Sequence, residues 1–383
     1  LTMSDNGTLI RIMSWNCKGL NGTVKHNKIL SHVNTMEADV MFLQETHLKF
    51  CSQTVLHKSW VGHLFHSKFN LKLRGVAILI RKNIPFICND SISDPQGRFI
   101  IVTGKLCGTP VILANIYAPN FNCVLDPLLD RSSNSQQTLT KSAKLIRHFL
   151  NSANLVDPWR DHNPSKHEYS FFSWRHNSYT RIDMFLVDSK LKPIIKRVQY
   201  EAIVLSNHGP VTLLLGFPKF PSPRTWKMNN SFLTNESFKE FIDSQLAFYF
   251  ETNDSPDISK QCLWKAMKAY MHGQIISHSV FKTKKEKFEK QSLAQQILKL
   301  DQQYSCKPNP QTLAERTALQ TKFNLLSTNE AVKLIRQTKQ NFYEHGEKPS
   351  PQDRAAHYPL YFLLLQLSHL QSLYALWRTI QAF

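Results

Sequence analysis

Polar side chains stand where apolar, strand-like runs end in the first half of the chain. The five that could do chemistry together are Asn16, Glu45, Tyr117, Asp183 and His208. A layered sheet exposes the ends of its strands, so side chains placed there can meet in one site. A glutamate there can hold Mg²⁺, which prefers oxygen ligands and keeps several waters. Because a histidine paired with an aspartate can donate a proton or stabilise an oxyanion, this set suits hydrolysis of a phosphodiester.

Each of these residues also has an ordinary structural explanation when it is considered alone. Asn16 can cap a turn, Glu45 can be a surface carboxylate, and His208 can be a core histidine with satisfied hydrogen bonds. The functional interpretation therefore rests on the whole set. Within it, asparagine steadies a carboxylate or donates to a phosphate, and tyrosine donates a hydrogen bond to charge developing on phosphorus.

The elements that must position these residues are short β-rich runs bounded by Gly, Pro, Asn or Asp. The predicted strands are Leu9–Ser14, Val40–Leu43, Gly75–Arg81, Phe99–Val102, Val111–Tyr117, Tyr169–Trp174, Ile182–Val187 and Val211–Leu215. Helical spacing occurs between them at Val24–Met36 and Gln136–Leu150. Many strands with few helices predict an α+β or layered α/β domain whose sheets are largely antiparallel.

Beyond Phe217–Pro223, a Pro-rich stretch typical of a linker, the pattern becomes helical. Thr234 or Asn235 can cap the first helix. A stripe at four-three-four spacing predicts a helix that needs a partner, and its members are Leu293, Ile297, Leu300 and Tyr304. Pro308 and Pro310 then interrupt the chain before a second helix at Leu313–Tyr343. We expect a helical hairpin or a loosely packed arm without an active site of its own.

Composition restricts the class of protein. The 383 residues are 42% hydrophobic and carry 47 Lys and Arg against 28 Asp and Glu, which excludes collagen and wholesale disorder. A net charge of +19 favours a nucleic-acid partner over an anionic membrane, although a merely soluble basic protein is the alternative.

Seven scattered cysteines and a first segment without an apolar core predict a nuclear or cytoplasmic, intracellular protein. The apolar stretch near the end, from Leu360 to Trp377, predicts an amphipathic helix and not a membrane span.

Several motifs recur in one order along the chain. They are Trp-Asn-Cys-Lys-Gly-Leu-Asn at 15–21, Leu-Gln-Glu-Thr-His at 43–47, Gly-Val-Ala-Ile-Leu-Ile at 75–80, Asn-Ile-Tyr-Ala-Pro-Asn at 115–120, Tyr-Ser-Phe-Phe-Ser at 169–173, Arg-Ile-Asp at 181–183 and Ser-Asn-His at 206–208. This order resembles the endonuclease/exonuclease/phosphatase superfamily, and most of all the apurinic-endonuclease-like domain of long interspersed (non-LTR) retrotransposons. The helical stretch is similar to the connector that precedes the reverse transcriptase there. The resemblance divides the chain into a nuclease-like domain at 1–217, a basic helical connector arm at 218–350 and a divergent amphipathic tail at 351–383.

The resemblance implies a four-layer α/β sandwich, made of two packed sheets flanked by helices, and Mg²⁺-dependent nicking of DNA. By resemblance, Glu45 is the metal ligand, Asn16 lies beside metal and phosphate, and Tyr117 contacts the scissile phosphate. Asp183 would orient His208, which stabilises the transition state. The nick would leave a 3′-hydroxyl that primes reverse transcription.

The resemblance also implies DNA-binding residues. Arg131 matches a basic residue near the DNA backbone, and the stretch from Arg175 to Thr180 resembles the DNA-facing hairpin of the family. The implied partner is DNA, held by salt-sensitive backbone contacts. RNA is an additional partner expected for the helical arm, and no membrane is favoured.

Two departures from the family pattern affect the expected metal site. Where the family has Gly-Asp-Phe-Asn, this chain retains Asn122 but lacks the aspartate that activates water, together with the preceding helix and strand. The family's Ser-Asp-His contains the neutral Asn207 here, which can still offer a carbonyl oxygen. Asp126 and Asp130 follow Asn122 without the family spacing, and we expect neither to replace the missing aspartate.

Losing a general base costs about 10²–10⁴-fold in rate, and losing a carboxylate weakens Mg²⁺ binding. The sequence therefore predicts a Mg²⁺-dependent DNA endonuclease, with Mn²⁺ as an alternative ion, whose activity is weak or absent. One alternative is a catalytically dead nucleic-acid-binding remnant held by charge. The other is a product that does not fold stably, because a deleted strand leaves unpaired sheet edges.

Overall fold

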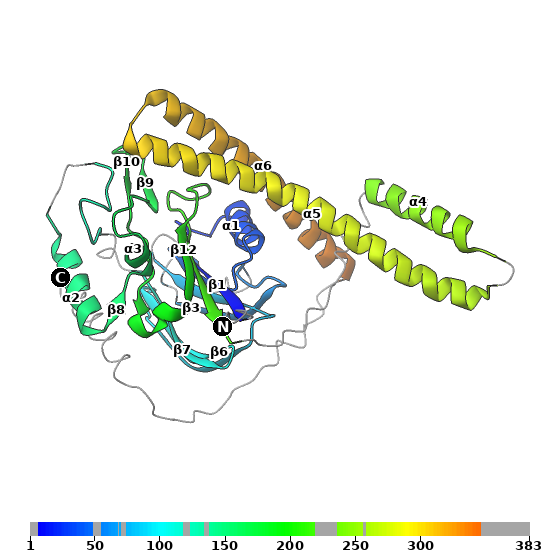
Figure 1. Ribbon diagram of the computed structural model, residues 1–383, viewed down its shortest axis with the longest axis horizontal. Coiled ribbons are helices and arrows are strands. Elements are labelled where there is room, and N and C mark those ends of the chain that lie inside the picture. The colour runs from blue at the N-terminus through cyan, green and yellow to red at the C-terminus, as the bar shows by residue number, and fades with distance from the viewer. Residues whose placement is uncertain are drawn as a thin grey trace, which may run out of the picture. The chain divides into compact units, whose positions relative to one another are not determined.

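Strands are the main regular structure of the first 217 residues, and long helices follow (Figure 1). The computed structural model describes residues 7–48, 55–67, 69, 74–117, 123–133, 138–218, 236–255 and 258–345, without the side chains of 282, 283, 285 and 337–345. The strands are β1 (Thr8–Asn16), β2 (Val40–Gln44), β3 (Val61–Ser67), β4 (Val76–Arg81), β5 (Phe86–Ser93), β6 (Phe99–Leu106), β7 (Thr109–Ile116), β8 (Leu155–Val156), β9 (Phe171–Ser173), β10 (Ser178–Thr180), β11 (Val187–Asp188), β12 (Ile195–Tyr200) and β13 (Val211–Phe217). The helices are α1 (Thr23–Thr35), α2 (Lys141–Ser152), α3 (Pro158–His162), the 3₁₀ helix η3 (Ser189–Ile194), α4 (Glu236–Asn253), α5 (Lys260–Cys306) and α6 (Pro310–His345).

The main sheet has the strand order β12-β13-β1-β2-β4-β3. Its neighbouring strands run antiparallel except β1 and β2, which are parallel and pair Asn16 with Gln44 at their ends. A second, antiparallel sheet has the order β5-β6-β7, and two-stranded pairs join β9 to β10 and β8 to β11. This arrangement confirms the predicted layered α/β class with largely antiparallel sheets.

The main sheet is buried on both faces because its strands alternate between two apolar cores. Ile10 and Ile12 of β1 face the second sheet, in a core shared with Val102 of β6. Met13 and Trp15 of the same strand face the core on the α1 side. Successive side chains of a strand point to opposite faces, so this order of residues requires one partner layer on each side. The second sheet supplies one layer and α1 supplies the other.

The predicted strand at Ile182–Val187 is wrong except at its end, where Val187 pairs with Val156. The backbone N–H groups of Ile182 and Asp183 donate instead to Ser170 Oγ, at 3.1 and 2.9 Å. A side chain therefore satisfies the groups that would otherwise form a ladder with another strand. Helix α1 confirms the prediction at Val24–Met36. The helix expected at Gln136–Leu150 begins at Lys141, and the Thr140 hydroxyl caps it by accepting from Ala143 N at 3.1 Å.

Helices α5 and α6 form a hairpin around residues 307–309, as the sequence predicts (Figure 1). Pro310 begins α6, where its missing N–H costs nothing, and Asn309 Oδ1 accepts from Gln311 N at 2.9 Å. Tyr304, from the predicted stripe, packs against Leu313 of α6 and against Phe172 and Tyr179 of the β9–β10 pair. The suggested cap residues 234 and 235 and the predicted tail 351–383 lie outside the described residues.

The chain divides into two compact units. One comprises residues 1–222 and 294–383, so it includes α6 and the end of α5, and the other comprises 223–293. In the second unit, α4 packs on the first half of α5 through Tyr249, Leu263 and Met267, and Tyr249 donates to Leu263 O at 3.0 Å. The domain boundaries at 217 and 350 stay predictions.

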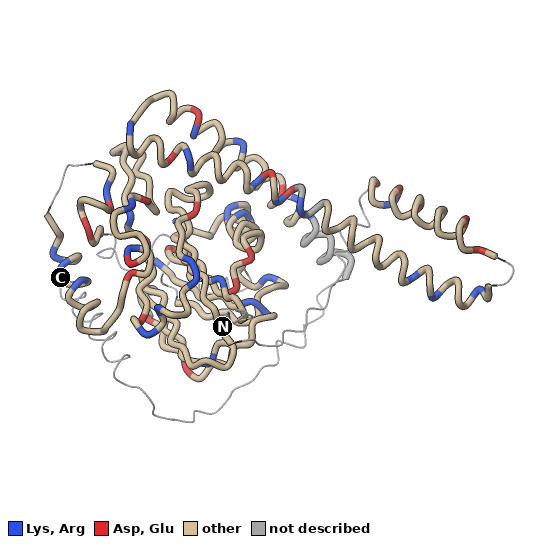
Figure 2. The backbone as a smooth tube through the Cα atoms, viewed as in Figure 1, with Lys and Arg blue, Asp and Glu red and all other residues tan. Residues whose placement is uncertain are grey.

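Charged residues occur throughout the described chain, and Figure 2 shows Lys and Arg on strands, loops and helices, with Asp and Glu between them. Among the helices that the structure describes, none is apolar over a sufficient length to cross a membrane.

Candidate active site

Asn16 and Glu45 lie close together because they stand at the ends of two neighbouring parallel strands. Asn16 is the last residue of β1, and Glu45 comes directly after β2. Glu45 has a φ of 49°, which turns the chain sharply away from the strand direction. Asn16 Nδ2 donates to Glu45 Oε1 at 2.8 Å. The buried amide thus fixes the orientation of the carboxylate, as the sequence predicts for an asparagine that steadies a carboxylate.

Tyr117 reaches the same place from the second sheet, through two buried amides beside the site. Gln44 Nε2 donates to Asn115 Oδ1 at 2.7 Å, and Asn115 Nδ2 donates to Leu43 O at 3.0 Å and to Ala77 O at 2.8 Å. Asn115 is 2% exposed, so these bonds form in a dry environment where an unpaired amide would be costly. The two amides fix β7 against β2, and so hold the residues that follow them, Tyr117 and Glu45, near one another.

Tyr117 stays protonated at physiological pH in this environment. Burial raises the pKa of its phenol, and the charge of Glu45 and a hydrogen bond to that carboxylate raise it further. The neutral phenol therefore donates to Glu45 and can donate to a phosphate oxygen that takes its place.

Asp183 and His208 form a hydrogen-bonded pair, as predicted. His208 Nδ1 lies 2.8 Å from Asp183 Oδ2, and because a carboxylate only accepts, Nδ1 carries the proton. Ser170 holds both partners: its hydroxyl accepts from Asp183 N, and its carbonyl accepts from Gly209 N at 2.6 Å. His208 is 4% exposed and its ring lies 4.7 Å from the Phe171 ring. The pair leaves Nε2 of His208 as the nitrogen that can act on a substrate.

The loop that carries His208 is bonded directly to the end of β1. Ser206 Oγ donates to Asn16 O at 3.0 Å, and Trp15 Nε1 donates to His208 O at 2.9 Å. Asn207, predicted as a metal ligand, lies between these two anchored residues. Asn16, Glu45, Tyr117, Asp183, Asn207 and His208 are therefore brought into one region by bonds between adjacent segments, and Asn122 lies outside the described residues.

The oxygen atoms at this site suit a hard cation such as Mg²⁺ by type, but they carry little negative charge to bind it. Glu45 provides a single carboxylate, and Asn16 and Asn207 could add only neutral amide oxygens, of which the Asn16 Oδ1 already accepts from Lys18 N at 3.1 Å. No group of three or more His, Cys, Asp or Glu side chains with metal-binding geometry occurs among the described residues. Mg²⁺ is commonly held through one or two carboxylates together with substrate phosphates, so this set can hold it only with help from the substrate.

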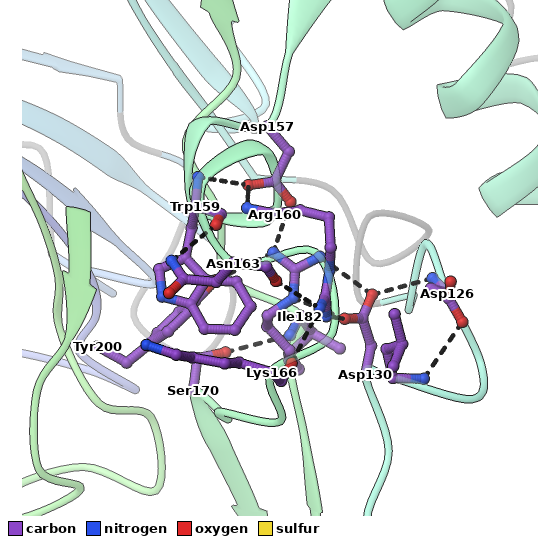
Figure 3. Close-up of polar contacts among 12 residues, drawn as sticks. Asp126, Asp130, Asp157, Trp159, Arg160, Asn163, Lys166, Ser170, Ile182 and Tyr200 are labelled. Atoms are coloured by element: carbon purple, nitrogen blue, oxygen red, sulfur yellow. Dashed lines mark hydrogen bonds and ion pairs between the residues drawn. The ribbon is translucent and has the colours of Figure 1, made fainter. Parts of the chain in front are cut away.

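Asp130 does not replace the missing aspartate (Figure 3). It is 0% exposed and accepts from Arg181 Nε at 2.7 Å, from Arg181 Nη2 at 3.1 Å and from Arg160 Nη2 at 2.6 Å. A carboxylate enclosed by two guanidinium groups has no access to an attacking water.

Asp126 is likewise committed to local structure. Its carboxylate accepts from Leu128 N at 3.0 Å and from Leu129 N at 3.2 Å, and its own N–H donates to Asp130 Oδ2 at 2.9 Å (Figure 3). This carboxylate caps a turn, a role that explains its position without catalysis.

The three predicted DNA-binding residues lie at the β9–β10 hairpin. Arg131 pairs with Thr180 in an isolated antiparallel bridge, and Arg175 is exposed in the turn between the strands. Phe172 N donates to Asn207 O at 3.0 Å, so the hairpin is fixed to the His208 loop. Their roles toward DNA stay predictions.

Sequence reasoning missed the residues that hold the site together, which are Gln44, Asn115 and Ser170. The signal was an amide or hydroxyl within or beside an otherwise apolar strand, a placement that requires a buried hydrogen-bond partner. It also missed His47, whose Nε2 lies 3.7 Å from Glu45 Oε2. Burial lowers the pKa of His47 and Lys25 lowers it further, although Glu45 opposes both, so His47 is neutral at pH 7.

Residues 13–208, just over half of the chain, match the Endonuclease/Exonuclease/phosphatase family. The chain belongs to this family. The matched segment begins in β1 and ends at His208, so it includes every residue of the region described above. The resemblance to the endonuclease/exonuclease/phosphatase family that the ordered motifs indicate is therefore confirmed.

A relative in Xenopus laevis, the Transposon TX1 uncharacterized 149 kDa protein, is 25% identical over 269 residues, which are 61% of this chain and 20% of that protein. The chain thus spans about one fifth of that relative's length. The AP endonuclease LMAP of Leishmania major is similar with a TM-score of 0.43 and 17% identity, covering 55% of this chain and 88% of that one. The endonuclease domain of TRAS1, a telomere-specific non-LTR retrotransposon, has a TM-score of 0.39 and 13% identity, covering 55% and 100%.

Proposed function

We propose that this chain is a DNA-directed phosphodiesterase of retrotransposon origin whose nicking activity is strongly reduced. The observation that carries the proposal is the joining of two pairs, Asn16 with Glu45 and Asp183 with His208, through Ser206. Family membership of residues 13–208 and the likeness to a transposon protein support the choice of substrate and origin.

Each site residue has a distinct role in the proposed hydrolysis, which follows from its chemistry. Nε2 of His208 faces the substrate phosphate as a donor when protonated, and Asp183 stabilises the charge that the ring then carries. Tyr117 donates to a non-bridging oxygen, and Asn16 keeps Glu45 in a fixed orientation. Glu45, with Asn16 and Asn207 nearby, would hold Mg²⁺, which when bound neutralises charge on the phosphate.

The reduction in rate follows from what the site lacks. Asp126 and Asp130 are engaged elsewhere, so the described residues offer no carboxylate other than Glu45 beside Asn16 to activate water. General-base activation contributes about 10²–10⁴-fold, so we expect nicking slower by a factor in that range than in a member with a complete set.

A second function, DNA binding without cleavage, is favoured by the charge of +19 and by the single carboxylate. Binding requires Lys and Arg contacts to phosphates and no metal site. RNA binding by the helical segment, and a nuclear or cytoplasmic location, belong to the same proposal and rest on the basic composition.

The test is nicking of supercoiled plasmid by the full chain, with Mg²⁺, with Mn²⁺ or with EDTA. We expect slow nicking that requires the metal and disappears in Glu45→Ala and in His208→Ala. The control is Lys192→Gln, an exposed position on η3 whose bond is to Asp161. Nicking that persists in both site variants would overturn the enzymatic proposal. Filter binding of the same DNA separates the second function, since a folded protein that binds without nicking supports it.

A further inference from the structure

Helix α6 contacts the loop that leads to His208 through two polar side chains. Arg316 Nη2 donates to Ile203 O at 2.9 Å, and Gln320 Nε2, one turn later, donates to Val204 O at 3.1 Å. Residues 201–210 connect β12 to β13 without a regular ladder of their own, apart from one bridge at His208. A buried backbone carbonyl needs a partner, and α6 supplies it for two successive residues of this loop.

Arg316 is also bonded to the other half of the helical hairpin and stacked on the β9–β10 hairpin. It is 1% exposed, and its Nε donates to Asp301 Oδ1 of α5 at 2.8 Å. The same carboxylate oxygen accepts from the Tyr179 hydroxyl of β10 at 2.5 Å. The guanidinium carbon lies 5.6 Å from the centre of the Phe172 ring. One buried side chain therefore joins α5, α6, the hairpin and the loop.

These contacts converge on the backbone that carries His208. Phe172, under the guanidinium group, donates its N–H to Asn207 O at 3.0 Å. The neighbouring Phe171 pairs with His208 in an antiparallel bridge. The loop is thus held from two directions by groups that Arg316 touches, directly at Ile203 and indirectly through Phe172. The matched family segment ends at His208, more than a hundred residues before Arg316.

We propose that Arg316 and Gln320 are positioning residues for His208, so that the helical extension completes the site that the family segment begins. The consequence for DNA hydrolysis rests on the proposed function. The placement of the loop is independent of the proposed function, because it is a property of the protein without DNA or metal. Removing the two donors leaves the carbonyls of Ile203 and Val204 without partners and releases the loop while the two-sheet core stays folded.

The experiment compares full-length Arg316→Gln, Gln320→Ala and Lys322→Gln. The last is the matched control, since it removes one positive charge from an exposed position of the same helix. Hydrogen exchange, without DNA or metal, is followed at residues 203–209 and 171–179 and at β1 and β2. We expect exchange at least about tenfold faster in the first two segments for both test variants, unchanged exchange in β1 and β2, and no change for the control.

A second readout is the Nδ1 proton resonance of His208, identified by its loss in His208→Asn. It should shift or broaden in Arg316→Gln and recover in part in Arg316→Lys, which retains one donor. If Arg316→Gln does not fold, Gln320→Ala decides, because this half-buried side chain makes two bonds, one to Val204 O and one from Arg316 Nη1. Arg316 keeps its bonds to Asp301 and Ile203 in that variant. Unchanged exchange at 203–209 in Gln320→Ala, or exchange that rises equally throughout the strands, would overturn the proposal. Because no DNA is present, loss of the proposed nicking activity would leave this result intact.

Discussion

At the scale of single residues, the reactive side chains of the site are held in place by hydrogen bonds from neighbouring residues. Asn16 fixes Glu45, and Ser170 fixes the Asp183–His208 pair at both ends. Asn16 and Ser170 are themselves buried, and a buried polar group that loses its partner costs about 1–3 kcal/mol. The geometry of the site therefore depends on these hydrogen bonds as well as on the residues that react.

Asp183 gives a direct prediction at this scale. Asp183→Asn replaces the acceptor of the His208 Nδ1 proton with an amide, so the ring loses its fixed tautomer and its charge partner. We expect nicking to fall by about 10²-fold or more, with the dissociation constant for DNA changed less than about twofold. Plasmid nicking and fluorescence anisotropy on the same preparations measure both. Equal losses in binding and cleavage would contradict a role confined to the histidine.

The sequence was sufficient to predict which candidate site residues lie together, but it did not identify the buried residues that position them. Asn16, Glu45 and Tyr117 were recognisable because each ends an apolar run. Gln44 and Asn115 were not, because the bond between them crosses from one sheet to the other and no local pattern encodes that pairing. Asn122 lies outside the described residues, so its predicted role stays a prediction.

At the scale of elements, ion pairs hold the segments that flank the site. Arg181, two residues before Asp183, bonds Asp130 through two nitrogens and Asp157 Oδ2 through a third. Tyr200 of β12 adds a bond from its hydroxyl to Asp183 O at 2.9 Å. This network ties the loop after β7, helix α3 and strand β12 to the segment that carries Asp183.

Asp130→Ala should therefore destabilise the protein strongly. The substitution removes the carboxylate that Arg181 and Arg160 share, and of its carboxylate partners Arg181 keeps only Asp157. Removing one partner of a buried ion pair costs about 3–5 kcal/mol. Asp161→Ala is the matched control, since it removes a half-exposed pair with Lys192 that contributes at most about 1 kcal/mol. Urea unfolding of the two variants compares them, and equal midpoints would contradict the assigned importance of the network.

His26, on helix α1, should make the stability of the protein depend on pH. Burial, with a smaller effect of Lys58, lowers the pKa of His26 from 6.5 to about 4. Between these values the unfolded chain binds a proton that the folded chain excludes, so this residue lowers stability as pH falls from 6.5 toward 4 and has no effect above 6.5. Thermal unfolding at pH 7 and pH 5 should therefore show a smaller decrease for His26→Gln than for the wild type. A decrease of the same size in both would refute the assignment.

Strands made of a continuous apolar run could be predicted from the sequence, whereas a strand that carries exposed charged residues could not. Strands β1, β2 and β4 alternate between two cores and follow the predicted runs. Strand β12, with Lys196 and Arg197 exposed, lacks such a run and pairs at one edge of the main sheet. The segment Ile182–Val187 was wrongly predicted as a strand because its apolar spacing matches one. In the structure, the backbone N–H groups of Ile182 and Asp183 donate to the Ser170 hydroxyl instead.

At the scale of the molecule, the grouping of α6 with the strands was beyond sequence reasoning. Helix α6 meets helix α1, which covers the main sheet, through His32 and Phe323, whose rings lie 5.6 Å apart, and through Ser31, which donates to Glu330. Neither contact has a local signature, because each joins residues nearly three hundred positions apart. The predicted helical hairpin was correct in kind, whereas its attachment to the site required the structure.

Net charge predicts how the whole protein binds DNA. With +19 at neutral pH, phosphate contacts should dominate the affinity and release condensed counterions. For three such contacts, raising the salt from 50 to 200 mM should weaken binding about 40-fold, with little preference among duplex sequences. Anisotropy titrations at several salt concentrations give the slope, and affinity that does not change with salt would contradict binding by charge.

The central claim is that missing carboxylates, and not a misplaced histidine or glutamate, reduce the activity. The most direct measurement is plasmid nicking by the full chain and by Asn207→Asp over a range of Mg²⁺ concentrations, with Asn207→Gln as the neutral control. The account predicts faster nicking by Asn207→Asp, with half-maximal activity at about tenfold less Mg²⁺, and no gain in Asn207→Gln. Identical curves for the wild type and Asn207→Asp would contradict it.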